Sequence, residues 1–271
     1  MGRGVWRWIV PDGLWEIAAP LIPPSNVRPQ GGGTQDTPDE TLFAAIIYVL
    51  ASGCAWRTLP PCFGTSKSTV HRRFVIWSKA GLLGRLHEAI DRIDECGLTD
   101  LSRVVLDSAH VRPQEGGELT GPSPVDRGKA RSKMHVLSDA NGLPLVVGIS
   151  AANTHDSLGL KPMVASLQTG HDPENGWSYR PRTLRADKAY DQPDLRRWLR
   201  GKRIGVRIAR KGIESSARLG RRSWVIERTF SWLTGYRRLN HRYERHPRNY
   251  LAFLGFAATL CCYKRLLRLT T

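Results

Sequence analysis

Three carboxylates stand where side chains from separate elements can meet. Asp107 follows the apolar run 104–106, Asp187 follows the short run 183–186, and Glu227 lies in an apolar stretch with helical spacing. Carboxylates at two strand ends and on a helix can converge on one point. Carboxylate oxygens bind magnesium, and two magnesium ions about 3.5–4 Å apart activate the attacking oxygen and stabilise the leaving oxygen of a phosphodiester. These three residues are therefore candidate metal ligands and catalytic groups.

Each acid alone also has a structural interpretation. Asp107 could cap a turn, Asp187 could begin one, and Glu227 could pair with Arg228 or Arg222. Helical spacing places Glu227 at the margin of the buried face, where a charge usually has a partner or a metal. The combination of three acids with a basic chain favours the metal site.

The charge is uneven along the 271 residues. The net charge is +17, yet residues 1–100 hold 10 Lys and Arg against 10 Asp and Glu, so the whole excess lies in residues 101–271. This excess favours a polyanionic partner such as a phosphate backbone. The alternative is a basic surface kept for solubility, but +17 exceeds the net charge of about 2–8 that is usual for a small domain.

The order of predicted elements indicates a mixed α/β fold behind a helical N-terminal region. Thr37-Pro38-Asp39 is typical of a helix start with Thr37 as the cap, and Gly53 ends that helix. Asn141-Gly142 indicates a hairpin turn. We expect helices at 37–53, from 66, at 82–93, 157–167, 192–200 and 222–239, and strands at 104–111, 134–137, 143–149, 183–186 and 205–209. We expect two domains, helical residues 1–98 and α/β residues 99–271.

Neither a zinc site nor a membrane span is expected. The five cysteines form no Cys-x-x-Cys pair and suit reduced thiols in the cytoplasm. The apolar run 250–263 is 14 residues long, short of the roughly 20 that span a bilayer, and predicts a buried helix.

Several ordered blocks carry a resemblance to a known family. Val-Val-Leu-Asp-Ser at 104–108, Arg-Ala-Asp-Lys-Ala-Tyr-Asp at 185–191 and Trp-Val-Ile-Glu-Arg-Thr-Phe-Ser-Trp-Leu at 224–233 resemble the acidic blocks of DDE transposases from bacterial insertion sequences, most closely the insertion-sequence-five family. Residues 118–129, 151–156 and 236–245 resemble that family's glycine-rich, Asn-x-x-Asp and basic C-terminal blocks, and residues 12–90 resemble its helical N-terminal domain.

This resemblance implies a ribonuclease-H-like mixed sheet flanked by helices, with an N-terminal all-helical, helix-turn-helix-like domain. It implies metal-ligand roles for Asp107, Asp187 and Glu227, with two Mg²⁺ ions, for which Mn²⁺ can substitute. The implied partner is double-stranded DNA, both element ends and target. Pairing two ends implies a homodimer or a higher oligomer on DNA, in the cytoplasm at the nucleoid.

One departure concerns the basic residues around Glu227. The broader superfamily often has Lys seven residues after the glutamate, and here that position is Thr234. The Tyr-x-x-Arg that can precede the glutamate is replaced by Gly220 and Ser223.

Candidate DNA contacts come from both halves of the chain. A recognition helix is indicated by Lys67, His71, Arg72 and Arg73. Further basic candidates are Lys188, Arg221, Arg222, Arg228, Arg237 and Arg238. Accessory candidates near the acids are Asn153, His155 and Asp156, where His155 could contact the scissile phosphate or serve as a structural hydrogen bonder.

The sequence thus predicts a transposase that binds the ends of a mobile element and performs metal-dependent strand cleavage and strand transfer. One alternative is a nuclease of the same fold that does not join ends. The other is a transposase-derived regulator that binds DNA without cutting it.

Overall fold

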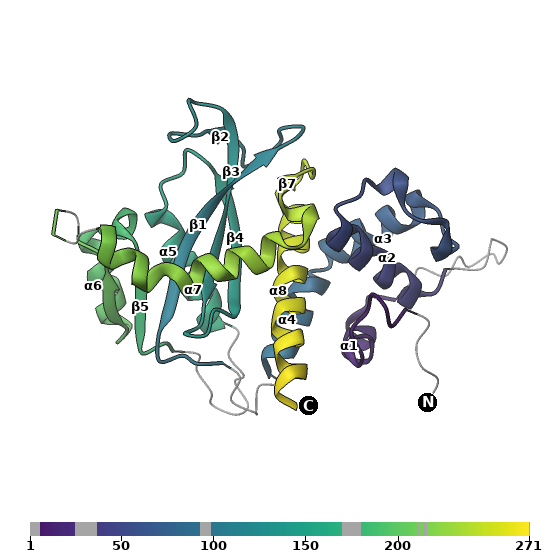
Figure 1. The fold of residues 1–271 in the computed structure, drawn as a ribbon, viewed down its shortest axis with the longest axis horizontal. Coiled ribbons are helices and arrows are strands. Elements are labelled where there is room, and N and C mark those ends of the chain that lie inside the picture. The colour runs from purple at the N-terminus through teal and green to yellow at the C-terminus, as the bar shows by residue number, and fades with distance from the viewer. Residues whose placement is uncertain are drawn as a thin grey trace.

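The computed structural model describes residues 6–24, 37–92, 99–169, 180–210, 212–213 and 216–270. A mixed sheet fills the half of the molecule that carries the acids, and helices cover both its faces (Figure 1). Its main strands lie side by side in the order β4-β3-β1-β5-β6. Their bounds are β1 Val104–Pro113, β3 Ala130–Ser138, β4 Pro144–Ala151, β5 Thr183–Ala186 and β6 Gly205–Ile208, with the short β2 Gly121–Pro122 beside β3 and β7 His241–Arg242 beside β1.

Strand direction matches the fold class expected from the family resemblance. β3 runs antiparallel to β1, and β4 runs antiparallel to β3. β5 and β6 run parallel to β1. The predicted ribonuclease-H-like mixed sheet with an N-terminal helical region is confirmed.

Alternation along β1 divides the core between the two faces of the sheet, because successive side chains of a strand point to opposite faces. Val104 and Leu106 pack with Leu160 of α5 (Ser157–Thr169) and Leu199 of α6 (Pro193–Gly201). Val105 packs instead in the cluster that contains residues of α7 (Ser216–Thr234) and α8 (Pro247–Thr270). Asp107 shares the α7 face with Val105.

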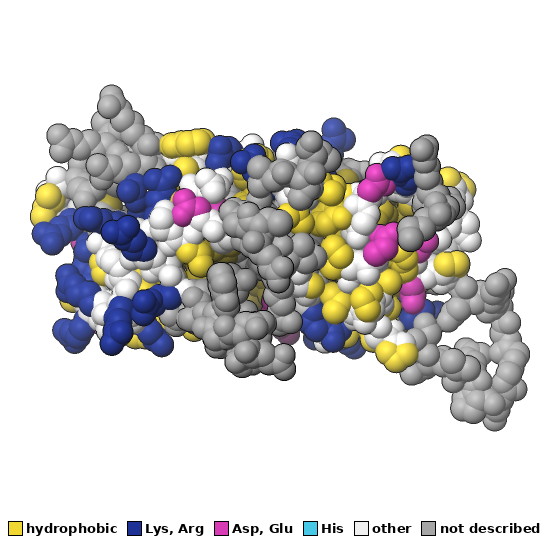
Figure 2. Space-filling view, turned by 90° about the horizontal axis from the view of Figure 1, so that it is seen from below, with side chains coloured by type: hydrophobic (Ala, Val, Ile, Leu, Met, Phe, Trp, Pro, Cys, Tyr) yellow, Lys and Arg dark blue, Asp and Glu magenta, His cyan; other side chains and the backbone are white. Residues whose placement is uncertain are grey.

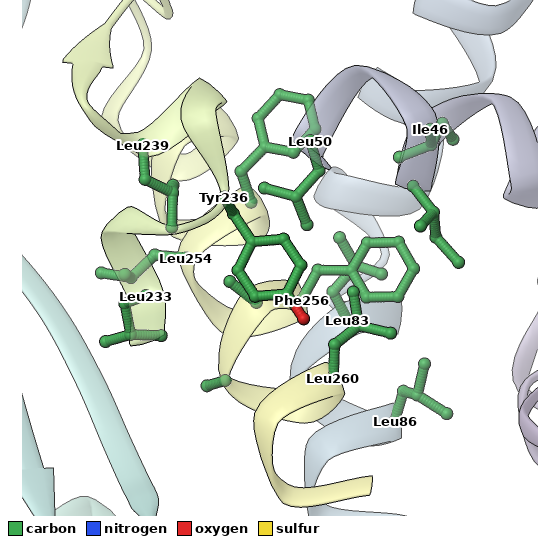
Figure 3. Close-up of a cluster of buried hydrophobic side chains, with 14 of the residues drawn as sticks. Ile46, Leu50, Leu83, Leu86, Leu233, Tyr236, Leu239, Leu254, Phe256 and Leu260 are labelled. Atoms are coloured by element: carbon green, nitrogen blue, oxygen red, sulfur yellow. The ribbon is translucent and has the colours of Figure 1, made fainter. Parts of the chain in front are cut away.

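Helix α8 stands between the sheet and the N-terminal helices (Figure 1). Those helices are α1 Leu14–Ala18, α2 Asp39–Ser52, α3 Lys67–Lys79 and α4 Leu82–Arg92. Phe256 and Leu260 of α8 meet Leu83 of α4, Leu50 of α2 and Leu233 of α7 in one apolar cluster (Figure 3). The apolar stretch of α8 is long enough to cross a membrane, but 67% of it is buried inside the molecule, so the prediction of a buried helix here is confirmed.

The turn between β3 and β4 docks helix α7. Gly142 has φ of 84°, a conformation that glycine adopts without steric cost, and the Asp139 carboxylate accepts hydrogen bonds from the Asn141 and Leu143 amides at 2.9 and 2.7 Å. The buried Thr229 hydroxyl donates to the Gly142 carbonyl at 2.7 Å. A Cβ on Gly142 would lie 3.0 Å from that hydroxyl. The predicted Asn-Gly hairpin is confirmed, and it fixes where α7 crosses the sheet.

Several predicted boundaries are wrong, among them the start of α7, which is Ser216 and not 222, and the start of β3, which is Ala130 and not 134. Helix α2 begins at Asp39 with Pro38 at the cap position, because the Thr37 hydroxyl bonds to that of Thr65 instead. The helix expected to reach 239 ends at Thr234, since Gly235 follows and glycine is costly inside a helix. By contrast, Ser66 caps α3 through the Thr69 amide as expected for a helix starting there.

Arg238 lies inside the molecule, which corrects its prediction as a DNA contact. Its side chain is 5% exposed and binds the Glu244 carboxylate at 2.7 Å. It also donates to the Cys54 carbonyl at 2.9 Å and stacks over the Tyr243 ring at 4.5 Å. Because its guanidinium is engaged by these three contacts, Arg238 connects the end of α2 to the segment before α8. It is too deeply buried to contact DNA.

We expect Arg238→Ala to lower the free energy of unfolding by about 3–5 kcal/mol, because removing one partner of a buried ion pair leaves the Glu244 charge unpaired. Urea denaturation measures the loss. The matched control is the exposed neighbour Arg237→Ala, expected within about 0.5 kcal/mol of the parent. Equal midpoints for the two variants would contradict the structural role of Arg238.

Candidate active site

Asp107 and Asp187 stand at the same level on neighbouring strands. β1 and β5 are parallel with Val105 opposite Arg185, and each acid lies two residues beyond its member of that pair. Asp107 accepts a hydrogen bond from the Ser108 amide at 2.8 Å. Asp187 follows β5 directly and accepts one from the Ala189 amide at 2.9 Å, which holds its carboxylate at the strand end.

Glu227 reaches the same region from α7. Its side chain is exposed, while Ile226 and Thr229 beside it are buried. The Glu227 charge is among those that raise the pKa of Asp107. The structure therefore brings all three predicted acids together.

Burial raises the pKa of Asp107 to about 7. The Ser108 amide opposes this rise, and the charges of Asp187, Asp156 and Glu227 add to it. Burial likewise raises the pKa of Asp187, with Asp156 adding to the rise. The mutual repulsion of these carboxylates creates a site that favours a cation.

Asp156 is held beneath this group by two donors. Ser108 Oγ donates to Asp156 Oδ1 at 2.8 Å, and Lys133 Nζ, on a side chain 4% exposed, donates to the same oxygen at 2.7 Å. Burial raises the pKa of Asp156, but the hydrogen bonds from Lys133 and Ser108 outweigh burial and leave that pKa below its ordinary value. Lys133 also donates to the Thr154 carbonyl at 2.6 Å. Asp156 is thus an ionised, fixed neighbour of Asp107.

Two other accessory candidates border the same region. His155 is exposed, its Nδ1 shares a hydrogen bond with Ser157 Oγ at 2.7 Å, and its charge opposes the rise in the Asp187 pKa. Asn153 is exposed beside Gly121, where any Cβ would collide with its amide oxygen. The glycine-rich block therefore packs against the Asn-x-x-Asp block.

Sequence reasoning missed Lys133, Ser108 and Tyr190. Tyr190 is 1% exposed, and its hydroxyl lies near Ser108 but forms no well-aligned hydrogen bond to another described residue. Burial raises its pKa, and the charges of Asp107 and two neighbouring acids raise it further. The available signal for Lys133 was a charged residue inside the otherwise buried strand run 130–138.

Comparison with known proteins identifies the family. A sequence profile described as "Transposase DDE domain" matches residues 99–262, and one described as "Putative transposase of IS4/5 family" matches residues 10–87. The chain belongs to the IS4/5 family of DDE transposases.

Two relatives from Burkholderia cepacia agree with this assignment. This transposase is 37% identical over 171 residues to "Putative transposase for insertion sequence element IS402", covering 63% of this chain and 79% of the relative. It is 32% identical over 119 residues to "Insertion element IS402 uncharacterized 16.2 kDa protein", covering 43% and 81%.

Solved structures give a weaker likeness. The Mos1 mariner paired end complex with Mn has a TM-score of 0.33 at 10% identity, over 90% of this chain and 82% of that chain. The Mos1 transposase paired-end complex with left transposon end has a TM-score of 0.28 at 12% identity, over 79% of each. The family assignment rests on the sequence matches.

DDE transposase domains generally use divalent metal ions, and the donor set here fits that chemistry. Among the described residues, no three His, Cys, Asp or Glu side chains are preassembled as ligands of one ion. However, carboxylate oxygens are the ligands of hard divalent cations, and the charges of Asp187, Asp156 and Glu227 add to the rise in the Asp107 pKa that burial causes. The residues that fit a metal are Asp107, Asp187 and Glu227.

The predicted basic residues fall into three groups. Lys67, His71, Arg72 and Arg237 are exposed, and Lys188 is half-buried directly beside Asp187. Arg73 is half-buried, 3.5 Å from Asp39, and the side chains of Arg221 and Arg222 lie outside the described part of α7. Thr234 donates its hydroxyl to the Phe230 carbonyl and supplies no cation.

Arg228 is held by contacts within the protein. Its guanidinium lies 4.4 Å from the Trp224 ring and 4.8 Å from the Trp232 ring, and donates to the Asn141 carbonyl at 2.6 Å. With both ring contacts and a backbone acceptor, the half-buried Arg228 anchors α7 to the β3–β4 turn, and its role as a DNA contact stays a prediction.

We expect Asp107→Asn to stabilise the metal-free protein at pH 8. The Asp107 pKa is about 7 in the folded protein against 3.8 unfolded, so the unfolded chain loses its proton first. The free energy of unfolding then falls as pH rises from about 4 to 7. The amide removes this penalty, worth at most about 4 kcal/mol at 1.36 kcal/mol per pKa unit.

Urea denaturation in EDTA at pH 8 and pH 4.5 measures the difference between parent and variant. It should shrink at the lower pH, and added magnesium should stabilise the parent alone. A gap of the same size at both pH values would show that Asp107 carries no raised pKa.

Proposed function

We propose that this transposase binds the ends of a mobile DNA element, cuts them, and joins them to target DNA at Asp107, Asp187 and Glu227. The observation that carries the proposal is the convergence of these acids from β1, β5 and α7, expressed in the raised pKa of Asp107. The two family profiles support the proposal, because one matches the expected helical part and the other matches the expected catalytic part.

A bound divalent cation, Mg²⁺ or Mn²⁺, supplies activation of a water or hydroxyl nucleophile and neutralises the leaving oxygen. Asp107 within β1, Asp187 at the end of β5 and Glu227 on α7 would hold this cation. Lys133 and Ser108 keep Asp156 ionised and directed at this group. Lys188 and His155 stand beside Asp187, where a scissile phosphate would lie.

Recognition and chemistry fall to different parts of the chain in this proposal. We assign end recognition to residues 1–98, through the exposed Lys67, His71 and Arg72 on α3. We assign catalysis to residues 99–271, within which residues 101–271 carry the whole charge excess. Because two ends must be joined, the active form is at least a homodimer on double-stranded DNA, acting at the nucleoid in the bacterial cytoplasm.

We expect Asp187→Asn and Glu227→Gln to reduce magnesium-dependent strand cleavage at least about 100-fold while DNA binding persists. Loss of a residue that only supports a metal ligand already costs about 10–100-fold, so loss of a ligand itself costs at least as much. Gel analysis of labelled DNA carrying the repeats that flank the gene measures nicking.

The control is Glu88→Gln, which removes the same charge from an exposed site on α4 and should cleave at the parent rate. If Glu227→Gln still nicks the DNA, the third ligand is misassigned. Joined products with an added target duplex distinguish a transposase from a nuclease of the same fold. Binding without any cleavage by the parent would instead support the regulator.

A further inference from the structure

A group of cations lies at the end of the sheet opposite the acids. Figure 2 shows Lys and Arg side chains gathered at the left of the molecule, where Figure 1 places α6 and β5, while acidic and apolar side chains gather over the N-terminal helices. We call the following five exposed residues the amino-end basic patch: Arg180, Arg182, Arg200, Lys202 and Arg203.

The backbone holds these residues at the amino ends of β5 and β6. Arg182 directly precedes β5, and its carbonyl accepts from the Gly205 amide, the first residue of β6, at 2.9 Å. Arg200, Lys202 and Arg203 end α6, which returns the chain to that point. Asp187 lies at the other end of β5, five residues beyond Arg182 and about 16 Å away at roughly 3.3 Å per residue.

The patch lacks compensating charge. Within the described part of the chain, none of its five residues forms an ion pair. Cations at the C-terminus of a helix are favoured by its dipole, which accounts in part for Arg200 and Lys202. It does not account for Arg180 and Arg182, which belong to no helix.

Arg203 gives a second, independent observation. The chain leaves α6 through a Schellman motif: the Ile204 amide donates to the Leu199 carbonyl at 2.9 Å, and the Arg203 amide donates to the Arg200 carbonyl at 2.9 Å. This motif requires a left-handed residue at the position of Arg203, and its φ is indeed 57°. Glycine is the usual residue there because it has no Cβ penalty. Arginine pays the Cβ penalty that glycine avoids there, and strain of this kind concentrates at functional sites.

We propose that the amino-end basic patch is a second DNA-binding surface, which holds a phosphate backbone at the end of β5 away from the acids. The proposal rests on the proposed function only in taking DNA as the polyanion. Arginine and lysine donate to phosphate oxygens, and such contacts position a duplex without reading its sequence directly.

The test exploits opposite effects of one substitution. Arg203→Gly should raise the melting temperature, since the left-handed strain is relieved, and should weaken binding to a 40-bp duplex of arbitrary sequence. In EDTA, fluorescence anisotropy at several salt concentrations gives the slope of log affinity against log salt. One lost phosphate contact lowers that slope by about 0.9, and R200Q/K202Q/R203G should lower it by nearly three times as much.

The charge-matched control is K79Q/R265Q/R268Q on α3 and α8, which should leave the slope unchanged. The proposal would be overturned if R203G and the triple variant had the same salt slope as the parent. It would also be overturned if the control lowered the slope as much as the triple variant does. Because these measurements need no cleavage, they stand apart from the nicking assay. If the parent protein does not nick DNA, the proposed function is contradicted. The patch proposal is then still decided by the slope of log affinity against log salt concentration.

Discussion

The parallel pairing of β1 and β5 imposes the constraint on which the rest of the structure depends. It sets Asp107 and Asp187 side by side at one end of the sheet, where their like charges oppose each other in a partly buried place. Charges brought so close are costly unless an opposite charge arrives. Lys133 compensates Asp156 from within the sheet, while burial, and to a lesser extent the neighbouring acids, raises the pKa of Asp107.

The helix that carries Glu227 is positioned by contacts away from the acids. Thr229 and Arg228 fasten α7 to the carbonyls of Gly142 and Asn141, and Ile226 packs in the core beneath. A turn without any catalytic group therefore determines how close Glu227 comes to Asp107. The Asp139 carboxylate holds this turn through the Asn141 and Leu143 amides, so the approach of the third acid depends on a tight, hydrogen-bonded turn.

Much of the fold could be predicted because it is encoded locally. The Ser66 cap, the Asn141-Gly142 turn and the apolar runs before Asp107 and Asp187 each specify their own conformation over a few residues. The meeting of the three acids could be predicted from the order of elements. Arg238 and Arg228 could not, because a long cationic side chain looks the same in sequence whether it faces solvent or bonds to carbonyls at Cys54 or Asn141, far along the chain. Lys133 was missed for the same reason, since its partner Asp156 lies on the other side of a hairpin.

The position of α8 has a consequence for how the protein is made. Residues of α2 and α4 bury their apolar side chains against Phe256 and Leu260, about two hundred residues later in synthesis (Figure 3). Contacts between such distant segments form slowly. The N-terminal helices must therefore leave the ribosome with their apolar faces uncovered and wait for α8. A nascent chain of this transposase therefore carries unpaired apolar helix faces for most of its translation.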